Sequence, residues 1–398
     1  MPIRATKRGA ERTPLRGDWD VLVCGASFAG LAVCRELAGS GARILMVDRY
    51  EIGERQTSAC AAPTAWLEAL DLQDSIRQTF GDLVVHTPTR TFRWPLPWTF
   101  STFDYRELCL LMSAQAPVVA FETAKVDGRS GDTVHTDRGD LRAPLVVDAL
   151  GWRRVLSNRA AIQPPNARLS RGLEVHPHGG ADDLELWLDP GYVRAGYSWS
   201  FPAAGELRVG VGSFDPRDHV KEPTVRFAAD RGLPAERYQG NWIPHAMREP
   251  VEDGVFFCGD SAGHCFPTTA EGIRTAFFFG LACGRELRLV LEGRQTRAQA
   301  LERYAAFCEE RRYAFRWLLR VQRLVGRVNP YPAMTTALAL MSRPSFLDWA
   351  FGHYLELAPP SFVGSGRDGS AGGRIPAPGR PGRAHANAAE PAVGGAVA

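Results

Sequence analysis

Residues 21–30 read VLVCGASFAG, and residues 43–48 read RILMVD. The first stretch starts as a short apolar run and ends in a glycine-containing turn, and residues 31–37 after it have helical character. The second stretch is apolar again and ends in Asp48. A strand, a helix and a strand in this order predict a right-handed parallel crossover, which indicates the α/β class.

The turn has the composition of a phosphate-binding loop. Gly25, Ser27 and Gly30 lie between the strand and the helix, where free backbone N–H groups can bind a pyrophosphate. Asp48 lies 18 residues after Gly30, beside Arg49, and its carboxylate would accept hydrogen bonds from a ribose diol. Ser27 replaces the second glycine of the usual fingerprint. A tight turn in a nucleotide-free sheet is the alternative interpretation.

A second motif lies in the last third of the chain. Residues 259–263 read GDSAG, follow the apolar run at 255–257 and precede a long predicted helix that starts near Gly272 and Ile273. The Asp260 carboxylate would bind a sugar or ribityl hydroxyl, and the amides at the helix start would stabilise a ring that becomes anionic on reduction. The alternative is that Asp260 only caps a helix.

The two motifs, at residues 25–30 and 259–273, resemble the two halves of the FAD site in the para-hydroxybenzoate-hydroxylase-like flavoprotein superfamily. Residues 146–153 resemble the middle motif of that superfamily, with Leu150 in place of its aspartate. Arg106 stands where the superfamily has an arginine that touches the flavin or its phosphates. A solvated helix arginine is the alternative for this residue.

A further segment resembles the signature of geranylgeranyl reductases, which are flavoenzymes that saturate isoprenoid double bonds. Residues 197–202 read YSWSFP, and residues 210–212 read GVG. The period of a strand places the three aromatic side chains on one face, with Pro202 at the strand end. We expect this face to enclose the substrate pocket, although ordinary domain core is the alternative. The predicted pocket residues are Cys60, Tyr197, Trp199, Phe201, Pro202, Gly210 and Gly212.

Residues 56–63, which read QTSACAAP, depart from that family. Its members carry a Cys-Gly-rich segment here, whereas Cys60 has no flanking glycine. We therefore expect a stiffer loop, and a Cys60 that is a small buried residue rather than a reactive thiol.

The composition excludes several classes of protein. The 398 residues are 45% hydrophobic and carry a formal charge of only +3, so we expect no nucleic acid partner. The eight cysteines form no C-x-x-C pair, which predicts reduced thiols and no disulfide or metal site. No apolar run is long enough to span a membrane, and the basic N-terminus lacks the apolar region of a secretory signal. We expect a cytoplasmic protein, with peripheral membrane association left open.

The predicted layout is α/β, with a discontinuous Rossmann-like FAD domain, an inserted mainly antiparallel β-sheet substrate domain and C-terminal helices. Both chain ends lack the apolar residues needed to fold, so we expect them to be disordered. The predicted segments are 1–17 (disordered), 18–155 and 252–300 (FAD domain), 156–251 with parts of 82–103 (substrate domain), 301–363 (helical) and 364–398 (disordered).

Five arginines recur every three or four residues in the C-terminal region and would line one helix face. They are Arg312, Arg316, Arg320, Arg323 and Arg327. A solvated face is one interpretation, and docking to an anionic membrane surface or an acidic carrier protein is the other.

These features predict an FAD-dependent oxidoreductase in which reduced flavin gives a hydride to a carbon-carbon double bond of an apolar, isoprenoid-like or aromatic small molecule. An NAD(P)H-dependent flavin monooxygenase, either a hydroxylase or halogenase-like, is the main alternative. A non-catalytic flavin-binding protein is the third. Only one dinucleotide-binding unit is present, so we expect NADPH or NADH to act as a transient reductant.

Overall fold

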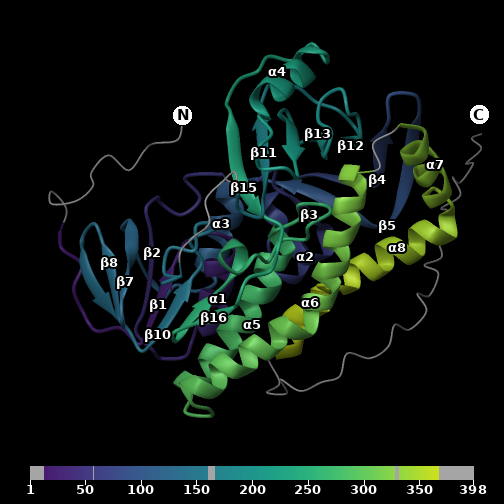
Figure 1. The fold of residues 1–398 in the computed structure, drawn as a ribbon. Coiled ribbons are helices and arrows are strands. Elements are labelled where there is room, and N and C mark those ends of the chain that lie inside the picture. Colours follow the sequence, from purple (N-terminus) through teal and green to yellow (C-terminus); the bar gives the residue numbers. More distant parts are fainter. Residues whose placement is uncertain (1–12, 57, 160–165, 328–330, 367–398) are drawn as a thin grey trace, which may run out of the picture.

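The computed structural model describes residues 13–56, 58–159, 166–327 and 331–366, with the backbone only at 325–327, 331, 332 and 366. Two sheets and a set of C-terminal helices make up the fold (Figure 1). A six-stranded sheet has the order β16-β17-β10-β1-β2-β6, and all its pairs are parallel except β16 with β17. Its strands are β1 (Val21–Cys24), β2 (Ile44–Asp48), β6 (Ala120–Thr123), β10 (Leu145–Asp148), β16 (Val251–Glu252) and β17 (Val255–Phe257).

Alternation along the parallel strands gives this sheet two buried faces. Val21, Val23 and Met46 pack in one hydrophobic cluster with α1 (Phe28–Leu37) and α5 (Ile273–Leu291). A Cβ on Gly280 of α5 would lie 2.8 Å from the carbonyl oxygen of Ala29. Glycine at this position therefore lets α5 lie directly against α1.

The other face of the parallel sheet carries a small antiparallel sheet. Leu22 and Leu45 pack there with Val134, in a cluster that also contains Leu15. The strands of the small sheet are β7 (Val126–Ser130), β8 (Thr133–Thr136) and β9 (Gly139–Arg142). Leu15 is buried, and its N–H donates to the carbonyl of Arg138 at 2.8 Å. The prediction of disorder up to residue 17 is therefore wrong for residues 13–17, because they pack against this sheet.

The second large sheet has the order β15-β11-β14-β13-β12-β4-β5-β3. Its pairs are antiparallel except β12 with β4. It takes in more of the N-terminal part of the chain than we predicted, because β3 and all of β4 and β5 belong to it. The strands are β3 (Ala61–Pro63), β4 (Ile76–His86), β5 (Thr91–Phe103), β11 (Leu169–Val175), β12 (Leu184–Trp187), β13 (Gly196–Pro202), β14 (Leu207–Ser213) and β15 (Gln239–Pro244).

Helix α4 (Lys221–Ala229) covers the outer face of this sheet, on the side away from the parallel sheet (Figure 1). Val175, Val209 and Val211 point to that face and pack with Phe227 of α4. The residues that alternate with these valines along β11 and β14 point to the opposite face. That face is directed at the parallel sheet and its helices, and it carries the aromatic and charged side chains described below.

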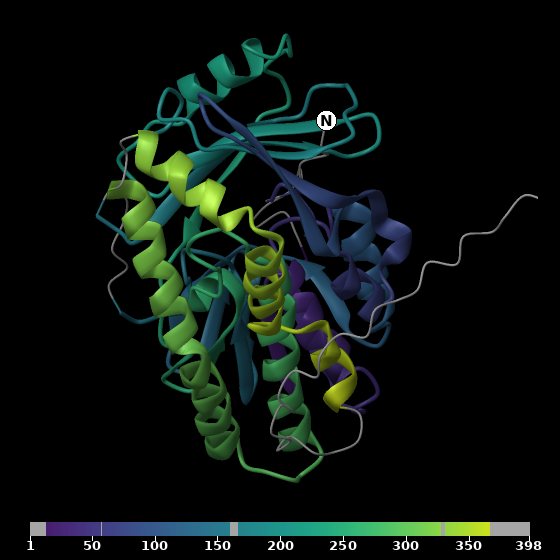
Figure 2. The same cartoon turned by 90° about the vertical axis from the view of Figure 1, so that its right-hand side faces the viewer.

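The remaining helices join the two sheets. The long α6 and the shorter α7 and α8 run along one side of both (Figure 2). The Trp66 indole of α2 donates to the carbonyl of Ala358 at 2.9 Å, so the end of the described chain is held on the core. No described helix is long and apolar enough to cross a membrane. These elements are α2 (Thr64–Ala69), α3 (Tyr105–Ala114), α6 (Arg297–Arg327), α7 (Tyr331–Met341), α8 (Pro344–Glu356), η2 (Gln73–Ser75), η3 (Gly259–Ala262) and η4 (Pro360–Gly366).

The parallel sheet with its crossover, the mainly antiparallel second sheet and the C-terminal helices confirm the predicted α/β fold class. Residues 364–366, which we assigned to a disordered tail, belong to η4. Residues 1–12 and 367–398 lie outside the described residues.

Candidate functional site

The turn after β1 is shaped by its two glycines. Gly25 has a φ of +114°, and a Cβ there would lie 2.2 Å from the carbonyl oxygen of Ala149. A Cβ on Gly30 would lie 1.9 Å from the carbonyl oxygen of Gly25. Ser27 is the N-cap of α1 but forms no side-chain cap, so the N–H groups of the first helical turn keep their capacity for an anion.

Asp48 holds this turn rather than standing apart from it. Its carboxylate accepts the Ala26 N–H at 2.9 Å and the Tyr50 N–H at 3.0 Å. Burial raises the pKa of Asp48, although these hydrogen bonds oppose the increase. Arg49 is exposed and stacks on the ring of Tyr50. Each carboxylate oxygen can accept a second hydrogen bond, so Asp48 retains capacity for a ribose hydroxyl.

Helix α3 brings Arg106 to the same turn. Asp104 caps α3 by accepting the Glu107 N–H at 2.8 Å, and the Tyr105 hydroxyl bonds to the Ser27 hydroxyl at 3.1 Å. The Arg106 side chain is exposed and has no ion-pair partner among the described residues. Contact of Arg106 with an anionic ligand stays a prediction.

The second motif meets the first, although about 230 residues separate them in the chain. A Cβ on Gly259 would lie 2.9 Å from the Cβ of Ala29, so the start of η3 lies against the start of α1. Asp260 points to the start of α5, with its Oδ1 3.7 Å from where a Cβ of Gly272 would be. Gly272 is the N-cap of α5, and Ile273 is its first residue.

The Asp260 carboxylate has no hydrogen-bond partner in the described part of the chain. Burial raises its pKa to about 6, and the Arg248 charge only partly opposes this. The Asp260 carboxylate is partly accessible and unpartnered, so it needs hydroxyl donors. The free N–H groups at the N-terminus of α5 favour negative charge nearby. A ribityl chain and a flavin ring offer these groups, so the residues present fit FAD.

Asp148 of the middle motif has a structural task instead. Its buried carboxylate accepts the N–H groups of Leu150 and Leu156 and the hydroxyl of Ser261. It therefore joins the end of β10 to η3. Leu150 offers no carboxylate of its own.

Trp199 lies flat across the inner face of the second sheet and packs directly on the backbone of two glycines. A Cβ on Gly210 would lie 2.2 Å from Cζ2 of the indole, and one on Gly212 would lie 3.3 Å from Cζ3. Tyr197, Trp199 and Phe201 are ring neighbours, with centroids 6.0 and 6.5 Å apart along β13. The absence of a Cβ at these two glycines of the signature therefore leaves room for the indole ring. We call these three residues the aromatic wall.

The aromatic wall is joined to the start of α5. The Tyr197 hydroxyl donates to the carbonyl of Thr269, three residues before Gly272. Burial raises the pKa of Tyr197, so this phenol keeps its proton. Pro202 ends β13, and its carbonyl accepts the Thr102 hydroxyl at 2.7 Å. The aromatic wall is therefore connected directly to the segment that leads into α5.

Cys60 is fully buried, as expected of a small apolar residue. It has a φ of +54°, a strained conformation for a residue with a Cβ. Its thiol donates to the carbonyl of Ser58 at 3.1 Å, and burial raises its pKa well above the usual value. The thiol therefore stays protonated near neutral pH.

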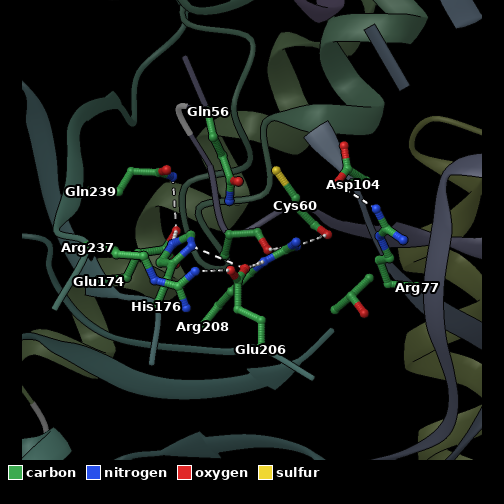
Figure 3. Close-up of polar contacts among 12 residues, drawn as sticks. Gln56, Cys60, Arg77, Asp104, Glu174, His176, Glu206, Arg208, Arg237 and Gln239 are labelled. Carbon is green, nitrogen blue, oxygen red and sulfur yellow. Dashed lines mark hydrogen bonds and ion pairs between the residues drawn. The ribbon is translucent and has the colours of Figure 1, made fainter. Parts of the chain in front are cut away.

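A buried set of charged side chains holds the Cys60 segment in place (Figure 3). Arg208 donates to the carbonyls of Ala59 and Cys60 at 2.9 and 3.1 Å and pairs with Glu206 at 3.2 Å. His176 lies between Glu174 and Glu206, at 2.9 and 3.2 Å. We call Glu174, His176, Glu206, Arg208 and Gln239 the polar network.

The polar network also holds the aromatic wall. Glu174 accepts the Trp199 indole N–H at 3.1 Å and the Gln239 amide at 3.0 Å. Burial alone would lower the pKa of His176, but its hydrogen bonds to the two glutamates raise it to about 9. The same contacts lower the pKa of Glu206 to about 2, against the effect of its burial. His176 and Glu206 are therefore ionised near neutral pH.

Sequence reasoning missed this network. His176 was not among the predicted site residues. The available signal was a set of charged residues at alternating positions, Glu174 with His176 and Glu206 with Arg208.

The arginine stripe on α6 is less uniform than predicted. Arg316, Arg320 and Arg323 are exposed, but Arg312 is largely buried, where it pairs with Glu309 and Glu249. The side chain of Arg327 lies outside the described residues. Docking of this face to an anionic membrane or an acidic carrier stays a prediction.

Comparison with known proteins agrees with this geometry, although no protein-family model matches the chain. Digeranylgeranylglycerophospholipid reductase 3 of Methanosphaera stadtmanae is 23% identical over 328 residues, which cover 73% of this chain and 82% of that protein.

Two solved structures have a similar fold. A geranylgeranyl bacteriochlorophyll reductase-like protein of Thermoplasma acidophilum matches with a TM-score of 0.74 and 18% identity, over 88% of this chain and 99% of that one. PqsL of Pseudomonas aeruginosa, described as a probable FAD-dependent monooxygenase, matches with a TM-score of 0.59 and 18% identity, over 85% of this chain and 100% of that one. The resemblance seen in the sequence is confirmed: the chain is similar in sequence to a geranylgeranyl-lipid reductase and shares the fold of FAD-dependent oxidoreductases.

Proposed function

We propose that the chain binds FAD between the turn at residues 25–30 and the start of α5. The turn and the first N–H groups of α1 would hold the pyrophosphate, with Arg106 beside it. Asp48 would bind the ribose, and Asp260 would bind the ribityl chain. The unpartnered Asp260 carboxylate at the N-terminus of α5 is the observation that supports this assignment most directly.

We infer that the reaction is saturation of a carbon-carbon double bond in an apolar, isoprenoid-like molecule. Bound FAD, once reduced, would supply the hydride, and the second carbon of the double bond would take a proton from solvent. NADPH or NADH would restore the reduced cofactor. One observation carries this inference: Trp199 of the aromatic wall packs on two glycines, and Tyr197 of the wall is hydrogen-bonded to the loop before α5.

The chain's own residues would bind and orient the substrate. The wall offers three aromatic rings to a hydrocarbon, and these keep water from the reacting carbons. The N-terminus of α5 would stabilise negative charge next to the wall. The Cys60 thiol stays protonated and neutral, so no charge from this residue would oppose an apolar ligand.

The names of the relatives favour this reaction. The Methanosphaera protein is named as a reductase of a geranylgeranyl lipid, and the Thermoplasma protein is named as geranylgeranyl reductase-like. A monooxygenase is the second candidate, and the fold shared with PqsL supports it.

The test is single-turnover chemistry without oxygen. We expect holoprotein that has been photoreduced anaerobically to regain the absorption of oxidised flavin when a geranylgeranyl compound is added. Mass spectrometry should find a product that has gained two hydrogens. A fully saturated compound of the same length is the control and should leave the flavin reduced.

Two results would contradict the proposed reaction. One is that the flavin stays reduced with every unsaturated isoprenoid until oxygen is admitted. The other is that the product has gained an oxygen atom, which would favour the monooxygenase.

A further inference from the structure

Glu271 and Arg274 form a buried ion pair at the N-terminus of α5. Glu271 directly precedes Gly272, the N-cap of this helix, and Arg274 lies in its first turn. The Arg274 Nε is 2.6 Å from the Glu271 Oε1, and the two side chains are 0% and 8% exposed. The N-terminus of a helix already carries partial positive charge, so a buried arginine there is electrostatically unfavourable by itself. The carboxylate beside it compensates this charge.

The C-terminal end of α8 holds this ion pair in place. Arg274 donates to the carbonyls of Tyr354 and Leu355 at 3.0 and 3.2 Å, and its guanidinium lies over the Tyr354 ring. These carbonyls belong to the last turn of α8, where they have no partner within the helix. The Tyr354 hydroxyl donates to the second carboxylate oxygen of Glu271 and is 2.6 Å from the Thr269 hydroxyl. Both oxygens of Glu271 therefore have partners, and its charge is fixed in position.

The negative charge of Glu271 acts on the groups around Gly272. The Cys265 Sγ lies 3.5 Å from where a Cβ of Gly272 would be. Burial raises the pKa of the Cys265 thiol well above its usual value, and the charges of Asp260 and Glu271 raise it further. Two carboxylates therefore act at the start of α5, where the backbone amides of Gly272 and Ile273 lie.

The two carboxylates differ in what they can do there. Asp260 has no hydrogen-bond partner in the described part of the chain, so it can accept from ribityl hydroxyls. Glu271 is already satisfied by Arg274 and Tyr354, so its effect on a bound cofactor would come from its charge alone. A flavin that takes up two electrons and one proton gains one negative charge. In a poorly solvated site, a fixed carboxylate disfavours that reduced state.

We propose that Glu271, fixed by Arg274 and Tyr354, lowers the reduction potential of bound FAD and so makes the reduced cofactor a stronger hydride donor. The inference rests on the proposed function and adds a residue that sets the driving force of its reaction. An isolated carbon-carbon double bond has no electron-withdrawing group that would favour hydride addition. A strong donor therefore suits an isoprenoid, and charge placed near the flavin ring is a means of obtaining one.

The test is the two-electron reduction potential of the holoprotein, measured without oxygen by slow reduction with xanthine and xanthine oxidase beside a reference dye. Glu271→Gln removes the charge but keeps the size of the side chain and an oxygen acceptor. We expect reduced FAD to bind about tenfold more tightly relative to oxidised FAD, which raises the potential by about 30 mV. Arg274→Gln should lower the potential, because Glu271 would lose its compensating charge.

Two controls separate the effect of charge from an effect on structure. Glu286→Gln removes a carboxylate from the same helix, about 20 Å further along its axis, and should leave the potential unchanged. Glu271→Asp keeps the charge and should restore the potential toward that of the parent protein. In Glu271→Gln the affinity for oxidised FAD should stay within a few-fold of the parent value, because the oxidised ring is neutral. A purely structural role would weaken it.

Tyr354→Phe is a variant that changes no charged residue and that we expect to fold. It removes one hydrogen bond from the Glu271 carboxylate, so the charge is less offset and the potential should fall slightly. An unchanged or lower potential in Glu271→Gln would overturn the inference, and so would a raised potential in Tyr354→Phe. These results would leave the proposed function standing, whereas a parent protein that binds no FAD would contradict the proposed function itself.

Discussion

The two sides of the proposed site differ in the groups that form them, which are backbone N–H groups on one side and buried side chains on the other. On the FAD side, the turn at residues 25–30 and the start of α5 present backbone N–H groups, and glycines give them room. On the substrate side, the aromatic wall and the Cys60 segment are held by buried side chains of the polar network. Backbone sites depend on shape and tolerate many neighbouring side chains, whereas a buried charged network depends on every member.

The largest expected effect comes from breaking the polar network at Arg208. Arg208→Met should lower the free energy of unfolding by about 3–5 kcal/mol, because the carbonyls of Ala59 and Cys60 would lose their buried donor and Glu206 would lose the more buried of its two guanidinium partners. Urea unfolding measures this.

Arg237→Met is the matched control. Arg237 pairs with the same Glu206 at 3.3 Å, but its side chain is 43% exposed. This variant should cost less than about 1 kcal/mol. Equal losses in the two variants would mean that the network does not depend on burial.

The next largest effect should come from the backbone side. Gly30→Ala places a Cβ 1.9 Å from the Gly25 carbonyl oxygen, so the turn must move. We expect FAD affinity to fall about 100-fold or more, which corresponds to about 3 kcal/mol. Titration of apoprotein with FAD, followed by flavin fluorescence, measures this change.

Gly180→Ala serves as the control for Gly30→Ala, because a Cβ at Gly180 meets nothing within 4 Å. It should bind FAD like the parent protein. Normal FAD affinity in Gly30→Ala with an unchanged circular dichroism spectrum would argue against pyrophosphate binding at this turn.

A smaller effect should follow from pH through His176. Its pKa is raised from 6.5 to about 9 in the folded protein, so its ionised contacts stabilise the fold fully below about pH 6.5. This stability is lost as the pH rises to about 9. We expect a loss of about 2 kcal/mol across that window, since one pKa unit corresponds to about 1.4 kcal/mol and other groups titrate as well.

The variant His176→Gln isolates this effect. Its unfolding free energy should be lower at pH 6.5 and should change less between pH 6.5 and 9 than that of the parent protein. A parent and a variant with parallel pH profiles would show that Glu174 and Glu206 do not hold an imidazolium.

The smallest expected effect concerns the link between the two sides. Tyr197→Phe removes only the hydrogen bond to the Thr269 carbonyl and keeps the ring in the wall. We expect a loss of about 1 kcal/mol in stability and a few-fold loss of FAD affinity, since the loop before α5 becomes freer. An unchanged FAD affinity would mean that the two sides bind their ligands independently.

The same contrast explains what could be predicted from the sequence. Gly25, Gly30 and Gly272 lie at fixed spacings next to strands and helices, so a short stretch of chain reveals the backbone-built half. The wall was also predictable, because Tyr197, Trp199 and Phe201 alternate within one strand.

The polar network could not be predicted in the same way. Its members lie on β11, β14 and β15 or one residue beyond a strand end. Their contact depends on the register of those strands, which pairs Glu174 with Gly210 and with Gln239. No local pattern sets that register. Leu15 was missed for a related reason, because the sheet that it covers is formed by residues more than 100 positions later.

The measurement that tests the division most directly is a pair of dissociation constants, for FAD and for a geranylgeranyl compound, in Gly30→Ala and in Trp199→Ala. We predict that Gly30→Ala loses FAD, while Trp199→Ala keeps FAD within a few-fold and loses the isoprenoid by about tenfold or more. If Trp199→Ala binds the isoprenoid like the parent protein, or if Gly30→Ala retains FAD, the division of the site into these two halves is wrong.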